Sequence, residues 1–95
     1  MTDGIALDVE PTTAAQCYER GMICASGRAG AIDLVAAHKW FNIAALRGIG
    51  DAIVLRREVA EQMSDAEIGQ AQRAARDWLK TSPLPAPAVE IRKAA

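Results

Sequence analysis

The chain has 95 residues, which is enough for one small domain. Hydrophobic residues make up 51% of the chain, but 20 residues are alanine, and small side chains favour close helix packing over a thick core. With 11 basic and 12 acidic residues and a net charge of −1, the chain lacks the basic excess of nucleic-acid-binding domains, so we expect no nucleic-acid partner.

Residues 1–11 are expected to form an N-terminal arm that ends at Pro11. The arm is acidic, and Ile5, Leu7 and Val9 alternate with other residues, which suits docking onto another surface. It lacks the basic and apolar regions of a signal peptide. No run of about 18 apolar residues occurs in the chain, so we expect no membrane span.

The first helix is predicted from Thr13 to Ala25, because Thr12 and Thr13 follow Pro11 and threonine is an acceptable N-cap. An apolar stripe at helical spacing runs along it. Gly21 lies within this stripe, where glycine costs about 1 kcal/mol relative to alanine. We therefore predict that another backbone packs closely against Gly21.

Cys17 and Cys24 are the only cysteines and lie on this same helix. Their α-carbons would be about 10 Å apart, beyond the limit of roughly 7 Å for a disulfide. We interpret them as small buried hydrophobic residues, with an intermolecular disulfide or a reactive thiol as the alternatives. A reducing, cytoplasmic location is expected.

Three further helices are predicted along the chain. After a glycine-containing loop at 26–32, Asp33 is the expected N-cap of a helix from Leu34 to Arg47, and Gly48 suits the left-handed position after its end. The third helix is predicted from Asp51 to Met63. Ser64 and Glu67 form the S-x-x-E pattern of a capping box, which predicts a fourth helix over 65–80. Residues 82–95 contain three alternating prolines and are expected to form an extended tail.

Short connections make neighbouring helices antiparallel. The sequence therefore predicts an all-α domain over residues 12–81, built from two stacked antiparallel helical hairpins, an α/α superhelix fragment.

The chain resembles the Sel1-like repeats, relatives of the tetratricopeptide repeats. The matching positions, in the family's order and spacing, are Gly21, Gly27, Asp33, Ala37, Trp40, Phe41, Ala44, Ala45, Gly48 and Ala52. The resemblance covers about a third of the chain and implies a short bacterial single-repeat protein, with a repeat at about 14–52 and capping helices at about 51–80. Arg56 and Arg57 stand where the family has a Leu-Gly pair, and the second loop glycine is displaced to Gly30, so a full second repeat is not expected.

His38 is the only histidine and lies on the apolar stripe of the second helix. We interpret it as a packed or half-exposed residue. The alternative, a general base, needs a nucleophile and an orienting acid, and the sequence shows neither in a recognisable pattern. One histidine and two cysteines do not match a zinc-site spacing. We therefore expect no catalytic residue, no metal and no cofactor, so the chain is not expected to be an enzyme.

Arg56 falls on the face of the third helix that should be buried. It is interpreted either as an arginine that extends to solvent while its stem packs, or as a basic contact in an open groove for an acidic segment. Arg57 is interpreted either as the partner of Glu61 one turn later or as part of that same contact.

The expected function is a protein–protein interaction module, an adaptor or regulator that binds a partner protein or peptide, as the Sel1-like resemblance implies. In stacked hairpins the first helix of each pair commonly lines the concave side. The candidate partner-binding residues are Tyr18, Glu19, Ile53, Arg56 and Arg57. The alternative function is a self-assembling structural subunit, such as a homodimer.

Overall fold

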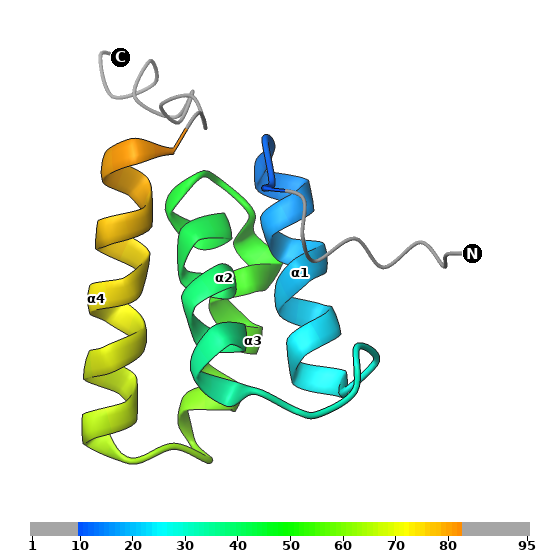
Figure 1. Ribbon diagram of the computed structural model, residues 1–95, viewed down its shortest axis with the longest axis vertical. Helices are drawn as coiled ribbons and strands as arrows, with labels where there is room; N and C mark the ends of the chain where they lie inside the picture. Colours follow the sequence, from blue (N-terminus) through cyan, green and yellow to red (C-terminus); the bar gives the residue numbers. More distant parts are fainter. Residues whose placement is uncertain (1–9, 83–95) are drawn as a thin grey trace.

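Four α-helices and no strand make up the part of the chain that the computed structural model describes, residues 10–82 (Figure 1). They are α1 (Ala14–Ser26), α2 (Leu34–Leu46), α3 (Gly50–Ala60) and α4 (Asp65–Thr81). The predicted all-α class is confirmed, and each helix begins within one residue of its predicted start. Residues 1–9 of the predicted arm and 83–95 of the predicted tail lie outside the described range.

Side-chain caps fix the start of three helices. The Thr13 hydroxyl and the Asp33 carboxylate each accept a hydrogen bond from the backbone N–H three residues later, at 3.1 and 3.0 Å. At α4 both halves of the capping box form: Ser64 Oγ accepts from the Glu67 N–H, and the Glu67 carboxylate accepts from the Ser64 N–H. Each cap pairs N–H groups that the first turn of a helix leaves without a partner.

The end of α3 differs from the prediction. The helix ends at Ala60, before the predicted Met63. The backbone N–H groups of Gln62 and Met63 bond to carbonyls three residues earlier, at 3.0 Å, so the chain tightens out of the α-helix. The predicted end was three residues too late, because the last residues before Ser64 form this tighter turn.

α2 is the central helix. α1, α3 and α4 all pack against it, whereas the other helix pairs have little contact (Figure 1). α3 and α4, the helices of the predicted second hairpin, follow each other along the chain. Each of them packs mainly on α2 and has little contact with the other. The buried side chains of α2 spread around most of its circumference, as expected for a helix that is covered on several sides. They are Ala37, His38, Trp40, Phe41, Ile43 and Ala44.

Phe41 fills the space between α1 and α2. It is 1% exposed, and the Tyr18 ring lies against it with centroids 5.9 Å apart. A Cβ atom on Gly21 would lie only 2.6 Å from Phe41 Cδ1. Close packing at Gly21 was predicted, but the group that approaches is the Phe41 ring and not a backbone.

Trp40 fills the space between α2 and α4. It is 6% exposed and makes an edge-to-face contact with Trp78 of α4, with ring centroids 5.0 Å apart and an interplanar angle of 78°. The two adjacent aromatic residues of α2 therefore face different neighbours, because successive side chains on a helix lie about 100° apart.

Candidate functional site

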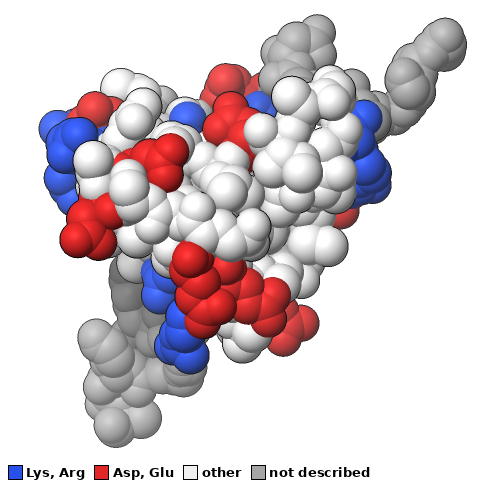
Figure 2. All heavy atoms as spheres, turned by 90° about the horizontal axis from the view of Figure 1, so that it is seen from below, with Lys and Arg blue, Asp and Glu red and all other residues white. Residues whose placement is uncertain are grey.

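The five candidate residues lie on two helices that both pack on α2 and have little contact with each other. Tyr18 and Glu19 are on α1, and Ile53, Arg56 and Arg57 are on α3. Figure 2 shows one end of the molecule, where acidic and basic side chains lie in separate small groups beside an uncharged region.

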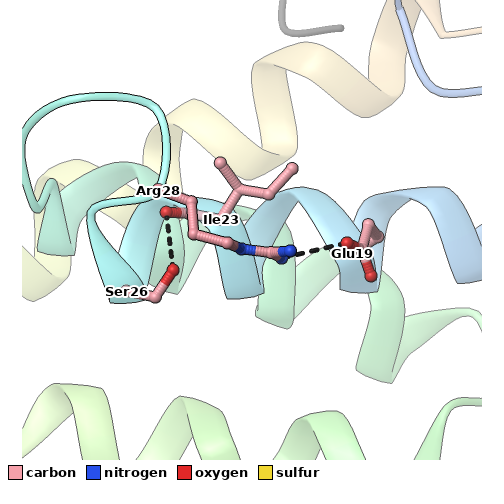
Figure 3. A network of polar contacts seen from close by, with 4 residues as sticks. All are labelled: Glu19, Ile23, Ser26 and Arg28. Carbon is pink, nitrogen blue, oxygen red and sulfur yellow. Dashed lines mark hydrogen bonds and ion pairs between the residues drawn. The ribbon is translucent and has the colours of Figure 1, made fainter. Parts of the chain in front are cut away.

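The two residues on α1 have partners within the fold. Tyr18 is half-buried against Phe41, so only part of its ring is available to a partner. Glu19 accepts a hydrogen bond from Arg28 Nη2 at 2.9 Å, and this arginine reaches back along α1 from the loop that follows it (Figure 3). The side chains of Arg28 and Glu19 are 49% and 59% exposed, so the pair contributes little to stability and can exchange partners easily.

α3 carries an exposed apolar surface. Ile53 and Val54 are 38% and 52% exposed, and Leu46 at the end of α2 is 49% exposed. Arg57 is exposed on the same side of α3 as Ile53, one helical turn further on. We call Ile53, Val54 and Arg57 the α3 surface.

Arg56 is half-buried between α2 and α3. Its Nη1 donates a hydrogen bond to Asn42 Oδ1 of α2 at 2.6 Å. This contact explains how the inner side of α3 tolerates an arginine. It also ties the guanidinium to α2, so of the two predicted arginines only Arg57 is exposed.

His38 is buried beside this pair. It is 3% exposed, and its Nδ1 has no hydrogen-bond partner within the described residues. Burial lowers the pKa of His38, and the positive charge of Arg56 lowers it further. The lowered pKa favours the neutral imidazole, and the side chain is packed within the fold, which is the first interpretation of His38 given above.

The two cysteines are free thiols with little nucleophilic character. Cys17 is fully buried and Cys24 is half-buried. Burial raises the pKa of the Cys17 thiol to about 11, and burial together with the nearby Asp33 raises the pKa of Cys24. Both are protonated at neutral pH, whereas the thiolate is the reactive form.

A second group of polar and aromatic residues surrounds Trp40. No sequence pattern indicated that these residues would lie together. The Lys39 ammonium lies 4.3 Å and the Arg20 guanidinium 5.3 Å from the centre of a Trp40 ring. Trp78 packs on Trp40 and donates its indole N–H to Glu10 Oε1 at 2.6 Å. We call Glu10, Arg20, Lys39, Trp40 and Trp78 the Trp40 cluster. Glu10 and Trp78 are 68 residues apart, so no local sequence pattern could have paired them.

Within residues 10–82 no three His, Cys, Asp or Glu side chains are grouped as metal ligands would be. In the same part of the chain, none of the helices has the length and apolar character needed to cross a bilayer. No protein-family model matches the chain, and no curated protein or solved structure matches it significantly. The Sel1-like resemblance thus rests on the motif residues alone and gains no support from these comparisons.

Proposed function

We propose that this chain is a non-enzymatic protein–protein interaction module, an adaptor or regulator, and that the α3 surface is its main contact with a partner protein. The observation that carries the proposal is the exposure of Ile53 and Val54 beside Arg57. Arginine is enriched at the centre of protein interfaces, and exposed apolar side chains beside it gain free energy when a partner removes them from water. Tyr18 and Glu19 of α1 are proposed to extend this contact, and Arg56 of α3 to support it through its hydrogen bond to Asn42 of α2.

Several observations favour binding over catalysis. His38 is buried, and burial lowers the pKa of His38 and raises the pKa of Cys17, which disfavours their use as base or nucleophile. The near balance of 11 basic and 12 acidic residues favours a protein over a nucleic acid as partner. Free cysteines favour a reducing compartment such as the cytoplasm.

The alternative is that the α3 surface packs on a second copy of this chain. Leu46, Ile53 and Val54 lie on neighbouring elements, and self-association would remove all three from water. The two functions make different predictions for the purified chain. An adaptor should be monomeric at micromolar concentration, whereas a self-assembling subunit should be dimeric and should become monomeric when Val54 is replaced by a polar residue.

The proposal is tested by pull-down with the purified chain, mass spectrometry of the captured protein, and measurement of its affinity. The double variant Ile53→Ser with Arg57→Glu should weaken that affinity at least about 10-fold. Arg76→Glu is the matched control, because Arg76 is an exposed arginine on α4, away from the α3 surface. The circular dichroism spectra of all three proteins should agree. Equal affinities for the wild type and the double variant would exclude the α3 surface as the site.

A further inference from the structure

The Trp40 cluster brings together two cations and one indole N–H donor, each from a different helix. Arg20 comes from α1, Lys39 from α2 and Trp78 from α4. Arg20 and Lys39 both lie over a face of Trp40, whose ring carries the partial negative charge that attracts cations. This arrangement holds two positive charges over the ring that packs against Trp78.

The carboxylate of Glu10 accepts the Trp78 indole N–H at 2.6 Å. Burial lowers the pKa of Lys39, and the negative charge of Glu10 opposes this lowering. The hydrogen bond from Trp78 is charge-assisted, and such bonds are stronger than those between neutral groups.

Glu10 lies where its carboxylate can leave the Trp78 indole and be replaced by another carboxylate. Glu10 is exposed and belongs to no helix, whereas the next residue, Pro11, is buried. The start of α1 and the end of α4 lie at the same end of the molecule (Figure 1), so Glu10 links two helices that have little direct contact. Glu10 could therefore leave the donors while Pro11 keeps the chain anchored.

We propose that Arg20, Lys39 and Trp78 form a carboxylate-binding site which Glu10 occupies from within the chain, and which an acidic segment of another protein occupies when it displaces Glu10. The site lies on α1, α2 and α4 and is separate from the α3 surface. An experiment that refutes this site therefore leaves the proposed function of the α3 surface standing. An outside ligand can bind only the molecules whose site Glu10 has left. Its apparent affinity is therefore the intrinsic affinity multiplied by the fraction of molecules in which the site is free.

The site can be tested with the full-length chain because its only two tryptophans, Trp40 and Trp78, both lie in it. The probe is a blocked synthetic peptide with the sequence of residues 6–13, ALDVEPTT, and the control peptide carries Gln in place of its Glu. Tryptophan emission is followed as each peptide is added to the wild type and to Glu10→Gln. The control peptide keeps Asp8, so a difference between the peptides reports the single carboxylate.

We expect the Glu peptide to bind Glu10→Gln at least about 5-fold more tightly than it binds the wild type. The Gln peptide should cause no change, and adding Lys39→Gln to Glu10→Gln should abolish binding. Equal affinities of the two peptides, or equal affinities of the wild type and Glu10→Gln for the Glu peptide, would overturn the proposal.

The wild-type chain provides a second measurement in case Glu10→Gln does not fold. The indole N–H resonance of Trp78 should move when the Glu peptide is added at millimolar concentration, the range in which it competes with a tethered group. It should not move with the Gln peptide. A resonance unaffected by either peptide at about 10 mM would refute the site.

Discussion

Replacing Gly21 by alanine should destabilise the protein, although the same change usually stabilises a helix. Gly21 lies in the middle of α1, where alanine has the better intrinsic propensity by about 1 kcal/mol. The added Cβ, however, would lie 2.6 and 2.7 Å from Cδ1 and Cε1 of Phe41. Phe41 is 1% exposed and packed between two helices, so its ring cannot simply move aside.

The magnitude follows from these opposing effects. Overpacking a core costs about 1–3 kcal/mol, and the gain in helix propensity offsets about 1 kcal/mol of this. The free energy of unfolding should therefore fall by up to about 2 kcal/mol for Gly21→Ala. Gly21→Leu, which adds further atoms at the same place, should lie near 3 kcal/mol.

Urea denaturation followed by circular dichroism measures this change, and Gly69→Ala is the matched control. Gly69 also lies within a helix, but its added Cβ would lie 3.4 Å from the end of the Arg73 side chain, which can move. Gly69→Ala should therefore stabilise by about 0.5–1 kcal/mol. Combining Gly21→Ala with Phe41→Leu should reduce the loss at Gly21, because the two sites are coupled. If both glycine variants were more stable than the wild type, the close contact with Phe41 would be refuted.

Two further predictions concern α2. Phe41→Ala should lower the free energy of unfolding by about 3–5 kcal/mol, and a circular dichroism melt coincident with that of the wild type would contradict its burial. Burial and Arg56 lower the pKa of His38 from 6.5, so the unfolded chain takes up this proton first and the free energy of unfolding should fall as pH decreases below 6.5. His38→Gln should lack this part of the pH dependence, and equal slopes of unfolding free energy against pH for the two proteins would exclude His38 as its source.

Features set by neighbouring residues could be predicted from the sequence. Thr13, Asp33 and Ser64 cap their helices because each side chain reaches a backbone N–H only three residues away. The different directions of Trp40 and Phe41 follow from the helical repeat alone. Burial of Cys17 was likewise expected from its place on the apolar stripe of the first helix, and it is fully buried.

Features that depend on contacts between distant residues could not be predicted. Arg56 was placed on a buried face, but its hydrogen bond to Asn42 requires the spacing of α2 and α3. Glu10 and Trp78 meet only because the start of α1 and the end of α4 reach the same end of the molecule.

The central place of α2 sets how the molecule comes apart. In an array of stacked repeats, each pair of helices can open while the remaining pairs keep their own interfaces. Here α1, α3 and α4 bury their apolar sides mainly on α2 and have little contact with one another. An outer helix can therefore detach and leave the other two in place, whereas loss of α2 removes the packing partner of all three. The amide protons of α2 are accordingly the ones whose exchange with solvent requires the whole domain to unfold.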